Sequence, residues 1–345
     1  MNRGVRALWC LAAGLALAGC PSGWVTEDSG VDVDLRGVWT LDGETAFAVG
    51  QGGTVLMREG GKWRQLRSGT ANDLYGVWGT SATHAVVVGD AGTALQWDGP
   101  VEPPDPPPPE PLPDLRALSS QTPANFRDIH GSSASWALIG SETSLQYYNG
   151  SELRDISNCG VQRIGVHVVQ DTVFAAGPPE LDDEGTVVGG GLCMGVINTS
   201  WTRYDPVACP VELEAGVCPL PDTQLDHPVL WGVWVGEGNQ GVVVGSAGYV
   251  WGWPAPEAGT WLPQPSKLTT DLRAVDGHEQ ADGSFEAYAV GDYGAALRIK
   301  GRGGRLEVSG EPIDANENLY GVSVSPDGAH AFVVGARGVI FHLFR

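Results

Sequence analysis

The chain has 345 residues, enough to bury a large core, and carries 41 acidic against 20 basic side chains, a formal net charge of −21. A body this acidic repels phosphate backbones and anionic lipid surfaces, so nucleic acid is excluded as an expected partner. The charges are spread along the whole chain, which is typical of a solvated surface.

Residues 1–19 are predicted to be a leader that takes no part in the fold. Two arginines precede an apolar run over residues 7–18, which is too short to cross about 30 Å of hydrocarbon as a helix and is typical of a signal peptide. The run ends in Leu17–Cys20, which resembles the lipobox of bacterial lipoproteins. The alternative is an ordinary secretory signal with an incidental cysteine.

The lipobox resemblance implies that Cys20 carries lipid and anchors the mature chain, residues 20–345, to the cell envelope. Pro21 follows the cysteine, where lipoproteins retained at the inner membrane have an aspartate. The resemblance therefore implies the outer membrane of a Gram-negative envelope.

The segment after the leader matches the end of a repeat. Its spacing of Trp24, Ser29, Gly30, Asp34 and Trp39 is that of Trp63, Ser68, Gly69, Asp73 and Trp78. We therefore predict that Trp24 to about Ser29 is an outer strand. It would complete the last repeat, whose third strand ends the chain, and so remove exposed sheet edges.

Seven copies of a first-strand motif follow one another along the chain. They are Leu35–Trp39, Leu74–Trp78, Phe126–His130, Arg163–His167, Leu230–Trp234, Leu272–Asp276 and Leu319–Ser323. A second apolar run follows each copy and ends in Gly50, Gly89, Gly140, Gly177, Gly245, Gly291 or Gly335. In five repeats another glycine stands three residues later, as a tight turn with positive φ requires: Gly53, Gly92, Gly248, Gly294 and Gly338.

Each repeat therefore predicts four short strands with no helical period between them. The mean repeat of about 47 residues lies near the 40–50 of four-stranded propeller blades. We predict an all-β, seven-bladed β-propeller whose last blade is closed by the N-terminal strand. A β-helix is the structural alternative, but its repeat is shorter.

Two insertions enlarge the propeller. The proline-rich stretch 100–113 predicts an extended loop, either a surface spacer or a docking motif for a partner. The insertion 178–224 contains most of the remaining cysteines. The four that follow Cys20 are Cys159, Cys193, Cys209 and Cys218. An even number in an exported domain indicates two disulfides, and loop topology favours Cys159–Cys193 and Cys209–Cys218.

The first strands of a closed propeller surround its axis, so equivalent positions form a ring. The position before the motif glycine holds Arg36, Tyr75, Arg127, Ile164, Trp231, Arg273 and Tyr320. The six polar or aromatic members are a candidate ligand-binding ring, because guanidinium forks and aromatic faces suit a carboxylate, a sugar acid or an acidic peptide. Alternatively, these side chains pack between blades and each arginine pairs with an acid such as Asp34, Asp128 or Asp271.

A second ring position holds Trp39, Trp78, His130, His167, Trp234, Asp276 and Ser323. His130 and His167 fall on adjacent blades, where they could share a metal ion or a proton, or be buried and hydrogen-bonded. The sequence has no H-E-x-x-H, G-x-S-x-G, P-loop or EF-hand pattern. We accordingly predict no catalytic residues, no metal site and no cofactor.

The repeat Asp73–Gly99 resembles those of bacterial, especially myxobacterial-type, lipoproteins with WD40/YVTN/BNR-like β-propeller repeats, and more distantly the photosystem-assembly-factor propellers. The resemblance implies the fold and says little about function. We expect a non-enzymatic binding or scaffolding module whose partner is an envelope protein or glycan. The alternative is a carbohydrate-active enzyme or lectin that uses the ring, and acids converging on Tyr75 or Tyr320 would favour it.

Overall fold

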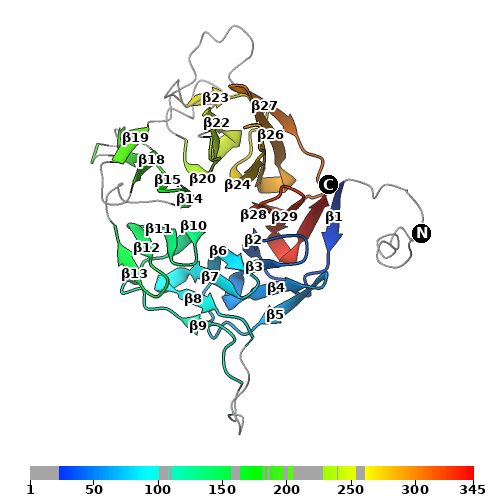
Figure 1. Ribbon diagram of the computed structural model, residues 1–345. Coiled ribbons are helices and arrows are strands. Elements are labelled where there is room, and N and C mark those ends of the chain that lie inside the picture. The colour runs from blue at the N-terminus through cyan, green and yellow to red at the C-terminus, as the bar shows by residue number, and fades with distance from the viewer. Residues whose placement is uncertain are drawn as a thin grey trace, which may run out of the picture.

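Seven four-stranded antiparallel sheets surround a common axis in the computed structural model, as the repeats predict (Figure 1). The structure describes residues 23–100, 108, 111–156, 164–181, 183–184, 187–189, 191–196, 201–204, 228–238, 240–253 and 261–345. No helix within these ranges is long and apolar enough to cross a membrane.

Each blade runs outward from the axis in four layers of strands. The innermost strands are β2 (Leu35–Thr40), β6 (Leu74–Ser81), β10 (Phe126–Ser133), β14 (Gly165–Val169), β20 (Leu230–Val235), β24 (Leu272–Glu279) and β28 (Leu319–Val324). The second strands are β3 (Ala46–Gly50), β7 (His84–Gly89), β11 (Trp136–Ser141), β15 (Thr172–Ala176), β21 (Gly241–Gly245), β25 (Phe285–Gly291) and β29 (His330–Gly335).

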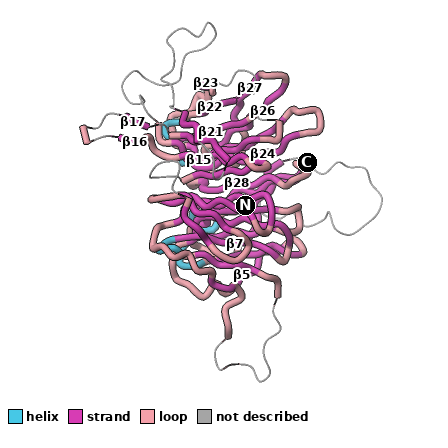
Figure 2. Tube along the Cα trace, turned by 60° about the vertical axis from the view of Figure 1, so that its left-hand side comes forward, coloured by secondary structure: helices cyan, strands magenta, loops and turns pink. Residues whose placement is uncertain are grey.

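The two outer layers complete each blade. The third strands are β4 (Val55–Glu59), β8 (Ala94–Trp97), β12 (Leu145–Tyr148), β18 (Leu192–Val196), β22 (Val250–Trp253), β26 (Ala296–Arg302) and β30 (Ile340–Phe344). The outermost strands are β5 (Lys62–Leu66), β9 (Arg116–Ala117), β13 (Leu153–Asp155), β19 (Trp201–Tyr204), β23 (Leu262–Gln264), β27 (Arg305–Gly310) and β1 (Gly23–Glu27). A further hairpin, β16 (Glu180–Leu181) with β17 (Val187–Gly189), projects from blade 4 (Figure 2).

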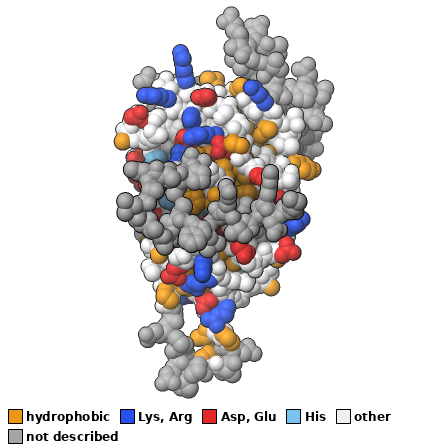
Figure 3. All heavy atoms as spheres, turned by 90° about the vertical axis from the view of Figure 1, so that its right-hand side faces the viewer, with side chains coloured by type: hydrophobic (Ala, Val, Ile, Leu, Met, Phe, Trp, Pro, Cys, Tyr) orange, Lys and Arg blue, Asp and Glu red, His pale blue; other side chains and the backbone are white. Residues whose placement is uncertain are grey.

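The insertions fall where the repeats predict, although their own structure stays untested. The proline-rich stretch 100–113 lies between β8 and β9, but most of it is outside the described residues, as is most of the insertion 178–224. Acidic and basic side chains are interspersed over the rim seen in Figure 3, in keeping with a solvated surface.

The apolar core is divided into seven clusters, one in each gap between neighbouring blades. Six clusters contain buried aromatic side chains, such as Trp251 and Trp261 between blades 4 and 5. The described buried members between blades 3 and 4 are only aliphatic residues and Cys193. Among the described residues, the buried part of that gap therefore contains smaller side chains than the other gaps, with Trp136 and Trp201 packed against it from the outside.

Tight turns join the second and third strands in five blades: η1 (Gln51–Gly53), η2 (Asp90–Gly92), η3 (Ser246–Gly248), η5 (Asp292–Gly294) and η6 (Ala336–Gly338). The last residue of each has positive φ, and a Cβ on Gly53 would lie 2.0 Å from the Thr70 carbonyl oxygen. Only glycine fits such a position, which explains the repeated glycine.

The middle residue of each turn ties its blade to the next one. Its backbone N–H donates to an Asp or Asn side chain just before the next inner strand, at 2.9–3.2 Å. The pairs are Gly52–Asp73, Ala91–Asn125, Ala247–Asp271, Tyr293–Asn318 and Arg337–Asp34. These ties run in one sense around the ring and satisfy N–H groups that the sheets leave unpaired.

The predicted closure is confirmed. Strand β1 pairs antiparallel with β30, from Gly23 opposite Phe344 to Glu27 opposite Ile340. The outer strand of the last blade therefore comes from the start of the chain. Trp24 in β1 also contacts blade 6, where its indole N–H donates to Glu311 at 2.8 Å and its ring packs edge-on against Tyr288.

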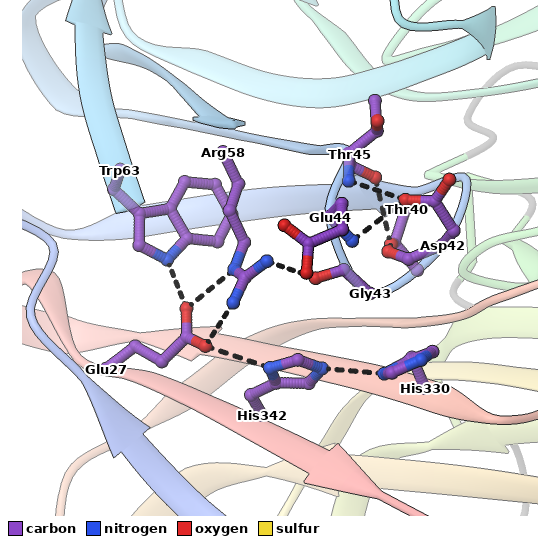
Figure 4. Close-up of polar contacts among 10 residues, drawn as sticks. All are labelled: Glu27, Thr40, Asp42, Gly43, Glu44, Thr45, Arg58, Trp63, His330 and His342. Carbon is purple, nitrogen blue, oxygen red and sulfur yellow. Dashed lines mark hydrogen bonds and ion pairs between the residues drawn. The ribbon is translucent and has the colours of Figure 1, made fainter. Parts of the chain in front are cut away.

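Glu27 joins the closing strand to blade 1 through the network in Figure 4. Its carboxylate accepts hydrogen bonds from the Arg58 guanidinium at 2.9 and 3.0 Å and from the Trp63 indole N–H at 2.7 Å. On the blade 7 side, His342 Nδ1 lies 2.8 Å from Glu27 Oε1, and His342 Nε2 lies 3.0 Å from His330 Nδ1. One carboxylate thus connects blades 7 and 1.

The Glu27 carboxylate is held in its charged form. Although burial opposes ionisation, hydrogen bonds from His342 and Arg58 outweigh it and lower the pKa of Glu27 to about 2. Because this pKa is depressed, its stabilising contribution is complete above about pH 4.5 and is lost as the pH falls towards 2.

Glu27→Gln is expected to lower the free energy of unfolding near neutral pH by about 3 kcal/mol, because it leaves the buried Arg58 without its counter-ion. The deficit relative to the wild type should shrink as the pH falls from 5 to 2. Urea unfolding across this range measures both effects. Glu59→Gln, which removes the exposed partner of Arg64, serves as the control, and equal losses in the two variants would contradict the closure role.

Candidate binding site at the axial mouth

All seven predicted ring positions meet at the axis. They line one cavity of about 510 Å³, to which every inner strand contributes. The ring members are Arg36, Tyr75, Arg127, Ile164, Trp231, Arg273 and Tyr320. Their convergence follows the geometry predicted from the repeats, whereas their role in ligand binding stays a prediction.

A β-bulge accounts for the position of the ring side chains. In six blades the pairing of the inner strand shifts by one residue at the ring position, for example between Leu35 and Gly37 around Arg36. A bulge re-aims the extra residue out of the sheet pattern. Beside it, a Cβ on Gly37 would lie 2.3 Å from the Tyr75 carbonyl oxygen, so glycine allows the inner strands to approach closely.

Arginine and aromatic members of the ring stack on one another. The Arg127 guanidinium lies 4.2 Å from the centre of the Tyr75 ring, and Arg273 lies 4.7 Å from that of Trp231. Arg36 sits between two rings, 5.1 Å from the centre of Tyr75 and 5.6 Å from that of Tyr320. These cation–π contacts hold the guanidinium groups at the cavity wall.

Two of the three arginines are neutralised by pairs of acids. Arg127 bonds to Asp90 at 3.1 Å and to Glu142, and its hydrogen bonds hold the pKa of Glu142 below its usual range. Arg273 bonds to two further acids, Asp271 at 3.2 Å and Asp292 at 2.7 Å. Pairing with acids, the alternative drawn from the sequence, therefore describes these two arginines.

Arg36 differs from them. Its single ion pair, to Asp34, spans 3.8 Å, and its buried Nε has no hydrogen-bond partner. A buried donor on a cationic group is costly in a folded protein unless water or a ligand supplies the acceptor. The ring thus contains one arginine with binding capacity left over.

The acids that bind the ring arginines were only partly foreseen. Asp34 and Asp271 pair with their neighbouring arginines as expected, but Asp128 does not. Its two oxygens accept the backbone N–H groups of Ile129 and of Val166 on the next blade, both at 2.8 Å. The expectation for Asp128 is wrong because the inner strand of blade 4 offers it a closer donor.

The remaining acids come from residues just after the second strand, a position that sequence reasoning missed. Asp90 and Asp292 directly follow the repeated glycine, and Glu142 stands at the corresponding turn of blade 3. The turn glycine was a usable signal, because it places the next residue at the same end of the blade as the ring.

The carbohydrate-active alternative finds one supporting contact. The Tyr75 hydroxyl donates to Asp90 at 3.4 Å, so an acid does converge on a ring tyrosine. The same carboxylate is the counter-ion of Arg127, and this pairing is sufficient to explain its position.

Both histidines are hydrogen-bonded; His167 is buried, whereas His130 is partly buried at the wall of the cavity. Their rings stack at 4.0 Å, the backbone N–H of Val168 donates to His130 at 3.0 Å, and His167 lies 2.9 Å from the Val235 carbonyl oxygen. Burial lowers the pKa of His130 to about 4 and that of His167 well below its usual value. Within the described ranges, no three His, Cys, Asp or Glu side chains gather as metal ligands.

Asp276 bridges two neighbouring inner strands, as Asp128 does, on the opposite side of the ring. Its carboxylate accepts the backbone N–H of Val324 on blade 7 at 2.8 Å. Burial raises the pKa of Asp276 to about 7 and that of Asp128 to about 6. Both bridges start from an inner strand that lacks the motif glycine. Asp128 replaces this glycine in blade 3, and Ala274 replaces it in blade 6.

The predicted disulfides remain predictions. Cys193 is fully buried in β18, at the gap between blades 3 and 4. Cys159, Cys209 and Cys218 lie outside the described residues, as does the proposed lipidation site Cys20.

Comparison with solved structures gives the same architecture. The chain is similar to the WD40 β-propeller domain of Doa1 (TM-score 0.64, 13% identity, 94% of this chain and 97% of that one). It is also similar to YCF48 bound to D1 peptide (0.64, 12%, 93% and 97%) and to YCF48 from Cyanidioschyzon merolae (0.58, 13%, 94% and 99%). No protein-family model and no curated protein matches the sequence. At these identities the likeness shows the fold.

Asp276→Asn is expected to stabilise the protein relative to the wild type increasingly as the pH rises from 5 to 8. The carboxyl of Asp276 ionises in the unfolded chain near 3.8 but in the folded protein only near 7, so ionisation costs wild-type stability over this interval. Because the side chain faces the cavity, we expect a difference of about 1–2 kcal/mol, less than the full shift implies. Urea unfolding at both pH values measures it. Asp282→Asn, at an exposed turn, should show no such trend, and a pH-independent difference for Asp276→Asn would refute the assignment.

Proposed function

We propose that the chain is a non-enzymatic, lipid-anchored binding module of the cell envelope that holds an acidic segment of a partner protein at the axial mouth. The observation that carries the proposal is Arg36, whose buried Nε has no partner in a ring where the other arginines are satisfied. A carboxylate of the ligand would bind the part of the Arg36 side chain that stays exposed, beside the faces of Tyr75 and Tyr320.

In the proposed site, only one of the three ring arginines is available to bind a ligand carboxylate. Arg127 and Arg273 already have two carboxylates each, so a ligand carboxylate there would have to displace one. Their role is to orient Tyr75 and Trp231 through cation–π contacts. Arg36 is the anchor for charge, and the aromatic rings are the anchors for the rest of the segment.

An exposed tyrosine extends the contact surface beyond the cavity. Tyr293 is 77% exposed in turn η5, next to Asp292, the ion-pair partner of Arg273. Its positive φ is shared by the middle residue of all five turns and therefore belongs to the repeated turn. Tyrosine is also common at the centres of protein interfaces. One solved propeller with this fold, YCF48, is described with a bound D1 peptide.

The position of the closing strand indicates which end of the propeller the proposed lipid anchor would place at the membrane. Gly23 pairs with Phe344, at the end of blade 7 opposite turn η6 and hence opposite the ring residues. Figure 2 shows the short turns and the C-terminus on different sides of the disc. Cys20 precedes Gly23 by three residues, which span at most about 11 Å. Lipid on Cys20 would therefore hold the mouth facing away from the membrane.

Arg36→Gln tests the site. The wild-type protein should select peptides with one fixed Asp or Glu over peptides that carry Asn or Gln at the same position. Loss of a charged hydrogen bond of about 1.5–3 kcal/mol should weaken binding of the selected peptides roughly 10- to 150-fold. Arg64→Gln, the same change on outer strand β5, is the control. Equal binding by the two variants would exclude Arg36 as the anchor.

Cys20→Ala tests the anchor. In a Gram-negative host the wild type should incorporate labelled fatty acid and enter the detergent phase, while the variant should do neither.

A second experiment tests the orientation, with fluorophores attached at Asp282→Cys or Asn316→Cys, at opposite ends of blade 6. In lipid vesicles, quenching by lipid-borne spin labels should be stronger for the fluorophore on Asp282→Cys. Equal quenching would contradict the orientation, and lipid-free wild type would contradict the anchor.

A further inference from the structure

We infer that the hairpin between β26 and β27 of blade 6 is a contact surface for the anionic headgroups of a phospholipid membrane. The hairpin turns at Gly303 and Gly304, and three cations surround the turn: Lys300, Arg302 and Arg305. All three side chains are exposed, and none of them lines the axial cavity. The group of three is called the basic tip below.

Strand register places the basic tip on one face of the hairpin. Lys300 and Arg302 are two positions apart in β26, and Arg302 stands opposite Arg305 across the turn. Residues at these positions share a face of a sheet. On the other face, Leu306 and Val308 pack against the apolar cluster between blades 5 and 6. These core contacts fix the direction in which the cations point.

The hairpin projects at the end of the propeller opposite the axial mouth. Strand β25 ends at turn η5, beside the mouth, and Phe285 at its other end pairs with Gly301, so the turn lies beyond that end. Counted from the repeated glycine, β25 has seven residues where β3 of blade 1 has five. Two more residues extend the blade 6 hairpin about 7 Å beyond that of blade 1.

A tight turn keeps the tip narrow. Gly303 and Gly304 have φ values of 56° and 77°, as a two-residue hairpin turn requires. A Cβ on Gly303 would meet no atom within 4 Å, so the turn itself is open to its surroundings. The cations on both sides of it can therefore reach a flat surface together.

The carboxylates near the basic tip leave it positively charged. Within the described ranges, none of its three cations forms an ion pair. Glu307 stands opposite Lys300 in the register. Asp282 lies in the adjoining turn between β24 and β25, where its carboxylate accepts hydrogen bonds from Ser284. Three cations against these two carboxylates give a positive formal charge in a chain whose net charge is −21.

The closing strand enters the fold beside this hairpin. Strand β1 lies at the rim next to blade 6, where Trp24 packs edge-on against Tyr288 at 5.5 Å (Figure 1). Gly23, which begins β1, pairs with Phe344 at the end of blade 7 opposite turn η6. The basic tip and the start of the described chain are therefore at the same end of the propeller.

This uneven charge distribution orients the molecule at an anionic surface. With the tip towards the membrane, the cations come within a Debye length of the headgroups, about 10 Å at 0.1 M salt, while most of the acidic body stays farther away. Guanidinium groups can also bind lipid phosphates with two hydrogen bonds. The opposite orientation would offer the surface mainly repulsion.

Flotation of the full-length protein with Cys20→Ala, which removes the proposed lipidation site, tests the contact independently of the anchor. Vesicles of phosphatidylcholine mixed with phosphatidylglycerol are compared with phosphatidylcholine alone at about 0.1 M salt. We expect about fivefold or stronger partitioning onto the anionic vesicles, lost at about 1 M salt. Arg302→Gln combined with Arg305→Gln should remove this preference. Both side chains are exposed, so the fold should persist.

Lys267→Gln combined with Arg337→Gln is the matched control, because it removes two exposed cations near turns η3 and η6 at the mouth end. It should leave the preference for anionic vesicles unchanged. Equal losses in the two double variants would overturn the inference, since net charge alone would then explain them. Equal partitioning of the Cys20→Ala protein onto both vesicles would also overturn it, as would tighter binding to a single-stranded oligonucleotide. Wild type without lipid would contradict the anchor and leave these comparisons intact.

Discussion

The pairing of β1 with β30 is the interaction on which the rest of the structure depends. Without β1, the last blade would end on an open edge, and blades 7 and 1 would be held only by contacts such as the Arg337–Asp34 tie and the apolar cluster between them. The link is reinforced on both sides, since Trp24 contacts blade 6 and Glu27 contacts blade 1. The apolar cores between blades each hold two neighbours, but only the closing strand continues along the chain into blade 1 while pairing by backbone hydrogen bonds with blade 7.

Closure also decides the geometry of the mouth. Once the ring is complete, the bulge at each inner strand directs its residue to the axis, and the turn-to-Asp/Asn ties hold neighbouring blades in a fixed sense. The ion pairs then distinguish otherwise equivalent arginines, because the second blade and the sixth supply acids where the first does not. The repeated inner-strand motif forms the ring, and the differences between blades in the acids near each arginine leave Arg36 available.

Regular parts of the molecule could be predicted because the same physical constraint recurs in every repeat. The turn glycines, the inner-strand motif and the spacing of Trp24 with Asp34 each report a backbone requirement, so the fold and closure follow from them. The acids that pair with the ring arginines could be predicted only where they are close in sequence, as Asp34 and Asp271 are; Arg127 bonds to Glu142 and Asp90 through three-dimensional proximity. Asp128 shows the difference most clearly, because its neighbour in sequence is an arginine but its hydrogen bonds go to the backbone.

The origin of the closing strand has a consequence for the order of folding. Glu27 and His342 are 315 positions apart, so β1 is among the first structured residues to be synthesised and cannot find its partner until the chain is almost complete. Contacts between such distant residues are slow to form because the intervening loop must be ordered first. Until β1 pairs with β30, the last blade has three strands and an open edge, so sealing of this seam is expected to be among the last steps of folding.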